Sequence, residues 1–323
     1  MKKHSELLTN KTITIFDVGA SGGFIDLPLL HKHISIYAFE PQPESYELLE
    51  KKYSENNFKS ATLFNIALSN KIGTGIFYKA THHSMSSLLQ PDNENFKTNF
   101  NRITNSKTWI SNIDTKATIT VDLSTIDSIA SQNKIENIDF LKLDTQGTEL
   151  DIIKGAEELI KNKKISIIKS EVLFTPVYKN QNYFSELDIY LRSNGYQFID
   201  CHFYPEIAQR ENKFAIGNKV VEKPKMMQNG DAFYVLDFTK IRNPDKDKLL
   251  KSGIILASLG FYSNATTLLE QYGMKKNEIK NLLLEFTDIS FKNTIKSALK
   301  RITPPIIAYW YSRIKFYKNL YSF

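Results

Sequence analysis

The residues with the clearest chemical potential in this sequence are acids and glycines that directly follow short apolar stretches. Asp17 lies in "FDVGASGGF" (16–24), which places three glycines within five positions, and Glu40 ends "ISIYAFE" (34–40). Glycine allows a positive φ in a tight turn or lets a ligand approach the backbone closely. An acid at the end of the next strand is suited to hydrogen-bond both hydroxyls of a ribose. The two stretches together predict a site for a nucleoside-bearing cofactor, although the glycines alone are also typical of a strand-to-helix turn.

The glycine spacing argues against two common phosphate-binding loops. A dinucleotide fingerprint that starts at Gly19 needs glycines at positions occupied by Ser21 and Phe24, and no G-x-x-x-x-G-K-[ST] motif occurs. S-adenosylmethionine fits better, because it carries no phosphate and its ammonium group would be attracted by an acid such as Asp17. An NAD-dependent oxidoreductase on a similar sheet is the less favoured alternative.

Three further residues are candidates for the chemistry of methyl transfer, which requires an aligned acceptor and control of one proton. An alcohol acceptor benefits from a general base, whereas an amine needs only its neutral lone pair. Asp144, at the end of "IDFLKLD", is the first candidate. His83, beside His82 in a polar stretch, is the second, and Glu171 within "ISIIKSEVLF" is the third.

Each candidate also has a purely structural explanation. Asp144 is of a type that often caps a following helix, and histidines on loops are usually just solvated. Glu171 has Lys169 and Lys142 as potential salt-bridge partners. Asp144 and Glu171 without a histidine cluster are too few ligands to predict a metal site, so we expect none.

These residues require a framework of strands that end at one edge of a sheet. Apolar runs predict seven strands, over 13–18, 34–40, 61–67, 138–144, 165–174, 196–203 and 231–238. Helical spacing predicts helices over 43–56, 148–161 and 183–195. Strands that alternate with helices imply an α/β fold with a mostly parallel sheet covered on both faces. Two long connections, 71–123 and 205–230, interrupt this alternation, and connections of such length are usually functional or disordered.

The length and composition of the sequence limit the number of domains and the cellular compartment that we expect. The 323 residues suffice for one large domain and a smaller appendage, and 41% apolar residues support a real core. The single cysteine, Cys201, cannot form an internal disulfide, which is typical of a reducing compartment. The N-terminus lacks the apolar segment of a signal peptide, and no apolar run reaches the ~18 residues of a spanning helix. We therefore expect a cytoplasmic protein.

The C-terminal part is predicted to be helical and to end in a basic tail. We expect the cofactor-binding domain at 1–240 and a helical extension at 241–323. Residues 290–323 contain seven Lys or Arg and no acid, so they carry the whole net charge of +7. Basic, aromatic, amphipathic helices tend to lie in an anionic membrane interface, here the inner face of the membrane. A packing helix with a solvated basic face is one alternative and RNA binding another, but the neutral main domain argues against nucleic acid.

Several segments occur in the order seen in one family of enzymes. They are "FDVGASGGF", "YAFEPQPESYELLEKK", "NIALSNKIG", "SSLL", "VDLSTIDSI" and "IDFLKLDTQGTELDIIKGAEELI". Over about residues 12–205 the sequence resembles FkbM-type methyltransferases, and "KLDTQGTELDIIKGA" is the most specific part. The resemblance implies the Rossmann-like fold of class I S-adenosylmethionine-dependent enzymes, with a seven-stranded, mostly parallel sheet. Nothing beyond about residue 240 resembles the family.

The resemblance also implies which residues bind the cofactor. Those around its methionine part would be Asp17, Gly19, Ala20, Ser21, Gly22 and Gly23. Glu40 would hold the ribose hydroxyls, Ala67 and Leu68 would lie near the adenine, and Asp144 would face the sulfonium or the acceptor. Ser21 stands where the family often has asparagine, which is a mild departure.

The resulting hypothesis is an S-adenosylmethionine-dependent O-methyltransferase. Its acceptor would be a hydroxyl of a sugar in a cell-surface glycan or its lipid-linked precursor, as the family resemblance and the basic tail suggest. A methyltransferase of a small-molecule metabolite and a non-catalytic, cofactor-bound scaffold remain alternatives.

Overall fold

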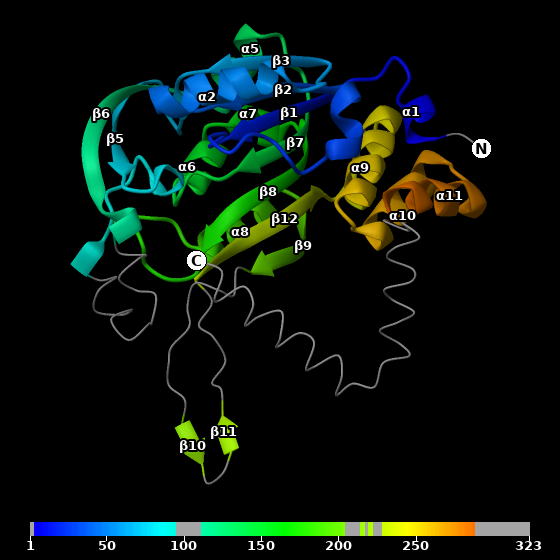
Figure 1. Ribbon diagram of the computed structural model, residues 1–323. Helices are drawn as coiled ribbons and strands as arrows, with labels where there is room; N and C mark the ends of the chain where they lie inside the picture. The colour runs from blue at the N-terminus through cyan, green and yellow to red at the C-terminus, as the bar shows by residue number, and fades with distance from the viewer. Residues whose placement is uncertain (1–2, 95–110, 204–213, 217–218, 222–227, 288–323) are drawn as a thin grey trace.

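The structure is a computed structural model that describes residues 3–94, 111–203, 214–216, 219–221 and 228–287. Its central element is a seven-stranded sheet in the order β3-β2-β1-β7-β8-β12-β9 (Figure 1). The strands are β1 (Ile13–Val18), β2 (Ile34–Phe39), β3 (Ser60–Phe64), β7 (Ile138–Leu143), β8 (Ile165–Leu173), β9 (Tyr196–Phe203) and β12 (Asn229–Leu236). Neighbouring strands are parallel except around β12, which runs antiparallel to β8 and β9. This confirms the predicted seven-stranded, mostly parallel sheet.

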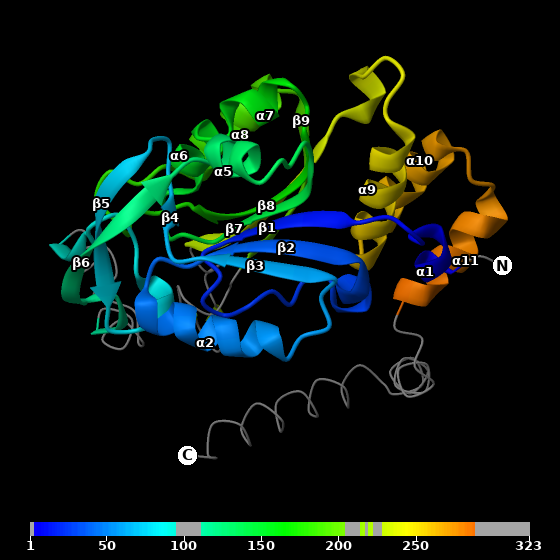
Figure 2. The same cartoon turned by 90° about the horizontal axis from the view of Figure 1, so that it is seen from above.

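Helices cover both faces of the sheet, as predicted. One face carries α2 (Pro43–Ser54), and the other carries α5 (Ile126–Gln132), α6 (Glu149–Lys154), α7 (Glu157–Lys161) and α8 (Phe184–Ser193) (Figure 2). The proline at the start of α2 suits the first helical turn because its φ is already fixed. Because both faces are covered, β7 and β8 are buried at nearly every position, which explains their continuous apolar runs.

The long connection at 71–123 contributes a second, smaller sheet. Its strands are β4 (Ala67–Leu68), β5 (Gly73–Ala80) and β6 (Thr115–Ser124), in the order β4-β6-β5, and the short 3-10 helix η2 (His83–Met85) follows β5. The predicted strand at 61–67 is therefore two strands, β3 and β4, which belong to different sheets. Two further strands, β10 (Phe214–Ile216) and β11 (Lys219–Val221), pair in antiparallel orientation.

One predicted helix was wrong in its extent. After the glycine turn, where no helix was predicted, the chain continues irregularly to the 3-10 helix η1 (Pro28–His33). The helix expected at 148–161 is interrupted near Gly155, between α6 and α7. A Cβ at Gly155 would lie 2.1 Å from the carbonyl oxygen of Ser69, and the Gly155 carbonyl accepts a hydrogen bond from the Asp127 N–H. The local sequence favours a longer helix, but these contacts with distant segments end α6 near Gly155.

The C-terminal region is helical, as expected, and packs at the amino ends of the strands. It consists of η3 (Phe238–Lys240), α9 (Lys246–Ser258), α10 (Tyr262–Tyr272) and α11 (Lys276–Phe286). Buried residues of α9, such as Leu249 and Ile254, belong to the same apolar cluster as the sheet. The Lys251 ammonium donates to the buried Asp139 carboxylate of β7 over 2.9 Å. The hydrophobic core is thus continuous across the predicted domain boundary at residue 240.

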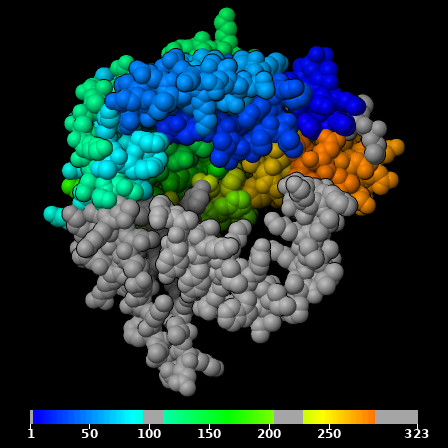
Figure 3. All heavy atoms as spheres, in the orientation of Figure 1, coloured from blue at the N-terminus to red at the C-terminus, as the bar shows by residue number. Residues whose placement is uncertain are grey.

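The N-terminal helix α1 (His4–Leu7) lies beside the C-terminal helices (Figure 3). His4 Nδ1 is 2.6 Å from a carboxylate oxygen of Glu285 in α11. In the part of the chain that the structure describes, no helix combines the length and apolar character needed to cross a bilayer. The basic tail at 290–323, predicted to meet a membrane surface, lies outside the described residues.

Candidate active site

Three strand ends meet at the carboxyl edge of the sheet and hold the acids and glycines together. β1 pairs in parallel with β2 on one side and β7 on the other. Backbone hydrogen bonds continue just beyond the strands. The N–H groups of Gly19 and Ala20 both donate to the Phe39 carbonyl, and the Asp144 N–H donates to the Val18 carbonyl. The turn after β1, the end of β2 and the turn after β7 therefore form one unit.

Gly19 shows why this unit needs a glycine. Its φ is +77°, a conformation that other residues rarely adopt. A Cβ at this position would lie 1.9 Å from the carbonyl oxygen of Asp144, which leaves no space for a side chain. At Gly22, by contrast, an added Cβ would have nothing within 4 Å. The glycines of the turn are thus not equivalent, and Gly19 serves the contact with the end of β7.

The unit borders a cleft that is open to solvent. Seven of the residues predicted from the sequence line it, namely Gly19, Ser21, Glu40, Ala67, Leu68, His83 and Asp144. Five others do not line it, namely Asp17, Ala20, Gly22, Gly23 and Glu171. The sequence did not single out the remaining polar lining residues, which are Ser84, Ser86, Thr145 and Thr148. Both threonines follow Asp144 in the segment most typical of the resemblance, and Ser86 begins the quoted segment "SSLL", so membership of these segments was the signal that could have identified them.

Glu40 is the buried acid of the cleft, with 5% of its surface exposed. The Gln42 N–H donates to its Oε1 over 2.9 Å. Burial and the nearby Asp17 carboxylate raise the pKa of Glu40 to about 7, although hydrogen bonds from the backbone of Gln42 and Ser21 oppose the rise. A carboxylate held in this way has lone pairs left to accept hydrogen bonds from a ligand.

Asp17 lies behind the cleft and is fully buried. The Lys142 ammonium donates to one of its oxygens over 2.9 Å, and the Tyr53 hydroxyl donates to the other over 3.1 Å. Tyr53 also accepts from the Phe24 N–H, which fixes the far end of the glycine turn. Burial lowers the pKa of Lys142, but the Asp17 and Asp144 carboxylates outweigh burial and raise it. These contacts show Asp17 bracing the turn; its role near a cofactor ammonium stays a prediction.

Asp144 reaches the cleft, since 45% of its side chain is exposed. Burial of the rest, together with the Asp231 and Asp17 carboxylates, raises the pKa of Asp144, and Lys142, with its Nζ 3.8 Å away, opposes this rise. Asp144 does not cap α6, so that structural explanation was wrong. The side chain of Glu149 accepts from the N–H groups of Thr145 and Gly147 instead, at 2.8 and 3.0 Å. Asp144 is therefore free to face the cleft.

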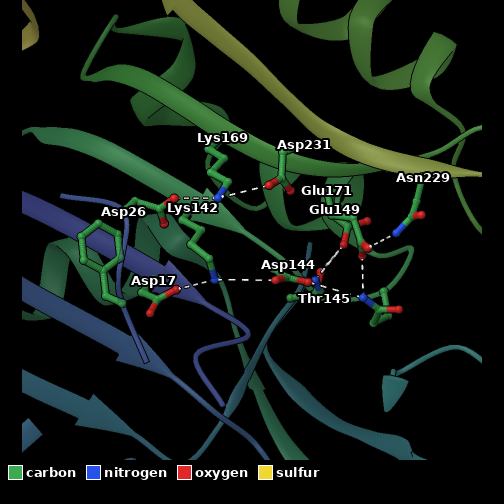
Figure 4. Close-up of polar contacts among 12 residues, drawn as sticks. Asp17, Asp26, Lys142, Asp144, Thr145, Glu149, Lys169, Glu171, Asn229 and Asp231 are labelled. Carbon is green, nitrogen blue, oxygen red and sulfur yellow. Dashed lines mark hydrogen bonds and ion pairs between the residues drawn. The ribbon is translucent and has the colours of Figure 1, made fainter. Parts of the chain in front are cut away.

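Glu171 is buried beside the turn that follows β7 (Figure 4). Its oxygens lie 2.6 Å from Gln146 Nε2 and 2.9 Å from Asn229 Nδ2. Burial and the Asp144 and Glu149 carboxylates raise its pKa well above the usual value. Neither expected lysine partner pairs with it.

The two lysines are engaged elsewhere. Lys142 contacts Asp17, and Lys169 bridges Asp26 and Asp231 at 2.7 and 3.2 Å (Figure 4). The prediction of a salt bridge to Glu171 was therefore wrong.

The histidine pair belongs to η2 and the residue before it. His83 lines the cleft, its ring stacked 5.1 Å from that of His82, and His82 Nδ1 lies 2.8 Å from the Ser84 hydroxyl. Among the described residues, no group of three or more His, Cys, Asp or Glu side chains is arranged to hold a metal ion.

The sequence profile described as "Methyltransferase FkbM domain" matches residues 17–198, which is more than half of the chain. This chain belongs to the FkbM methyltransferase family. It is therefore an S-adenosylmethionine-dependent methyltransferase, with S-adenosylmethionine as its cofactor. The FkbM match begins at the acid before the glycine turn and ends within β9, so it contains every residue of the cleft described above.

Solved structures give distant matches to this FkbM protein. The methyltransferase FkbM from Methylobacillus flagellatus KT has 15% identity and a TM-score of 0.40; the match covers 69% of this chain and 43% of that chain. Magnesium protoporphyrin IX methyltransferase from Synechocystis PCC 6803, with bound S-adenosylmethionine, has 10% identity and a TM-score of 0.35, over 72% of this chain and 76% of that one. No curated protein matches the chain.

The cleft of the FkbM domain fits its cofactor. One wall is apolar, with Phe39, Ile66, Ala67 and Leu68, and the buried Glu40 carboxylate stands beside it. An apolar wall next to a single acceptor suits a base and its ribose.

Proposed function

We propose that this FkbM methyltransferase acts on oxygen and methylates a hydroxyl of a sugar in a cell-surface glycan or its lipid-linked precursor. The observation that carries the proposal is the position of Asp144, a partly exposed carboxylate at the carboxyl end of β7, in the cleft that His83 of η2 also lines. Methylation of a hydroxyl requires removal of its proton, and Asp144 is the cleft carboxylate best placed to accept it.

The cofactor would be held by residues of three segments. Glu40 would accept hydrogen bonds from the ribose hydroxyls, Ala67 and Leu68 would pack near the adenine, and the backbone of the turn at 19–23 would lie along the methionine part. When bound, S-adenosylmethionine supplies an activated methyl group. The protein's own task is then to align the acceptor hydroxyl and to manage its proton.

Asp144 is suited to that task by its surroundings. The rise in its pKa makes it a stronger base than an ordinary aspartate, while Lys142 favours its ionised form. His83 lies on another wall of the same cleft and is the second candidate for proton transfer. Glu171 does not line the cleft, so it does not compete with these two for the acceptor.

Two features support a polyhydroxylated acceptor. The wall formed by η2 and the residue after it presents Ser84 and Ser86 in addition to His83, and such groups can exchange hydrogen bonds with several hydroxyls. The basic tail at 290–323 would bring the enzyme to an anionic surface that carries a lipid-linked substrate. Methylation of a small metabolite remains the alternative.

Transfer of a labelled methyl group from S-adenosylmethionine to a cell-envelope extract, followed by identification of the labelled sugar, tests the proposal. We expect an O-methyl ether on a sugar. Label in a small metabolite would favour the alternative, a methyltransferase of small molecules. Label on nitrogen would refute O-methylation. If no fraction were labelled, the result would favour a non-catalytic, cofactor-bound scaffold.

The role of Asp144 is tested with a matched pair of variants. Asp144→Asn should lower kcat by about 10²- to 10⁴-fold, the usual contribution of a general base. Asp122→Asn, at an exposed position on β6, should leave kcat unchanged. An Asp144→Asn variant with normal kcat would remove Asp144 from proton transfer.

A further inference from the structure

Gln146 lies at the centre of a chain of polar contacts that connects Glu171 to η2. The Gln146 amide group lies 2.6 Å from Glu171 Oε2 on one side and 3.0 Å from the Tyr178 hydroxyl on the other. The Tyr178 hydroxyl is also 3.0 Å from the carbonyl oxygen of Met85, the last residue of η2. Tyr178 and Glu171 are both buried, so solvent does not compete for these contacts.

The distances decide how the protons are distributed along this chain. With Nε2 of Gln146 toward Glu171, the amide oxygen faces the Tyr178 hydroxyl, which then has two acceptors and only one proton. One of its two 3.0 Å contacts would be left without a hydrogen. The 2.6 Å contact is also short for N–H···O, which is normally about 2.7–3.2 Å, but ordinary for O–H···O.

The opposite orientation of the amide satisfies every group. Glu171, if protonated, donates its O–H to the Gln146 oxygen, the Gln146 NH₂ donates to Tyr178, and the Tyr178 hydroxyl donates to the Met85 carbonyl. The oxygen and nitrogen of an amide are similar in size, so the hydrogen-bond network determines which way it points. The cost of this orientation is at Asp144, because the amide oxygen then replaces Nε2 at 3.4 Å from Asp144 Oδ1 and a contact at the limit of a hydrogen bond is lost.

We propose that Glu171 is a neutral carboxylic acid whose proton orders the chain Glu171–Gln146–Tyr178–Met85 and thereby positions η2 at the wall of the cleft. The surroundings of Glu171 favour the neutral form. Burial disfavours its charge most, the carboxylates of Asp144, Glu149 and Asp231 add to this, and no described lysine, arginine or histidine forms an ion pair with it.

The chain of polar contacts holds η2 at the active site. The Ser87 hydroxyl donates to the Gln146 carbonyl over 2.9 Å. The segment of η2 and the residues after it is therefore attached to the turn at 144–147 directly through the Gln146 backbone and, by way of the Tyr178 hydroxyl, through the Gln146 side chain. His83, Ser84 and Ser86 in this segment line the cleft. Glu171 is thus a positioning residue and not the general base. This positioning role rests on the proposed function in one respect, namely that the cleft is the place of methyl transfer.

Infrared difference spectroscopy of the ligand-free protein near neutral pH tests the protonation state directly. Glu171→Gln should remove the C=O stretching band of a carboxylic acid. The control Glu44→Gln, which replaces an exposed glutamate whose pKa is lowered by Lys79, should remove carboxylate bands instead. Loss of carboxylate bands in Glu171→Gln would overturn the proposal.

Binding of S-adenosylhomocysteine, the demethylated cofactor, tests the positioning role without any methyl acceptor. Glutamine at position 171 can donate to Gln146 and accept from Asn229 as the neutral acid does, so Glu171→Gln should bind within about 2-fold of the unchanged protein. Tyr178→Phe cuts the chain and should weaken binding by about 3- to 10-fold, the usual effect of one lost hydrogen bond. Equal weakening in the two variants, or none in Tyr178→Phe, would refute the chain. Failure of O-methylation with both results as expected would refute only the proposed function.

Discussion

The buried Glu40 leads to a specific prediction about how cofactor binding depends on pH. In the ligand-free protein its pKa is raised to about 7, chiefly by burial. An ionised carboxylate is the better acceptor for two ribose hydroxyls, so the bound state should favour loss of the Glu40 proton. Binding of S-adenosylhomocysteine should therefore release a proton at pH 6 and strengthen as the pH rises.

The size of the effect follows from the pKa. About a tenth of Glu40 is ionised at pH 6 and about nine tenths at pH 8, so the affinity should rise by about 10-fold between them, or about 1.4 kcal/mol. Glu40→Gln should remove this dependence. At pH 8 it should also weaken binding by about 2–3 kcal/mol, roughly 30- to 150-fold, because hydrogen bonds to a charged acceptor are lost.

The stability of the ligand-free protein should change in the opposite direction. A carboxyl whose pKa is raised from 4.5 to about 7 contributes stability that is fully present below pH 4.5 and is lost as the pH rises through 7. The loss amounts to at most ~3 kcal/mol at pH 8. Since glutamine has no charge to desolvate, Glu40→Gln should be at least as stable as the unchanged protein at pH 8.

Titration calorimetry at pH 6, 7 and 8, in buffers of different ionisation enthalpy, measures both affinity and proton release. Asp144 and Glu149 also have raised pKa values, so the comparison of the protein with Glu40→Gln at each pH isolates Glu40. Glu44→Gln is the matched control, because Glu44 is exposed at the start of α2. A constant dissociation constant across this range, or the same pH dependence in Glu40→Gln, would refute the assignment.

Three further predictions concern the turn, the C-terminal helices and the tail. Gly19→Ala should abolish binding of S-adenosylhomocysteine in calorimetry, because its Cβ would meet the carbonyl oxygen at the end of β7 at 1.9 Å, whereas Gly22→Ala, whose Cβ would meet no protein atom within 4 Å, should keep measurable binding; equal behaviour of the two would contradict the close contact. Lys251→Met should cost about 3–5 kcal/mol in urea unfolding, because it leaves the buried Asp139 uncompensated, and adding Asp139→Asn should recover much of the loss; a cost below ~1 kcal/mol would contradict this. The full chain should sediment with anionic liposomes and a version without residues 290–323 should not, and equal sedimentation would exclude the membrane role of the tail.

The strands and the site acids could be predicted because their signals are local. The β-branched run before Asp17 and the acid that ends the next strand are visible in any short window, and β1 and β2 form where expected. The order of the quoted segments along the sequence then indicated the FkbM methyltransferase family. The reason for Gly19 is not local, since the atom that excludes a side chain there belongs to Asp144.

Pairings between distant residues could not be predicted. Asp17 was expected to be near the cofactor, but its charge is compensated by Lys142, 125 residues further along the chain. From the sequence, Lys142 and Lys169 were equally plausible salt-bridge partners for Glu171. Only the register of β7 against β8 and the position of the loop that carries Asp26 show which acids these lysines contact. The break near Gly155 likewise depends on the approach of a distant carbonyl. In each case the sequence identifies a residue that matters, while its partner follows only from the packing of the sheet.

A crystal structure with S-adenosylhomocysteine tests the central claim most directly, namely that the cleft between the ends of β1, β2 and β7 is the site of methyl transfer. We expect the ribose hydroxyls on the Glu40 carboxylate, the adenine against Ala67 and Leu68, and Asp144 on the side of the sulfur atom from which the methyl group has left. A ligand bound elsewhere, or bound in this cleft with Asp144 remote from the sulfur, would contradict it.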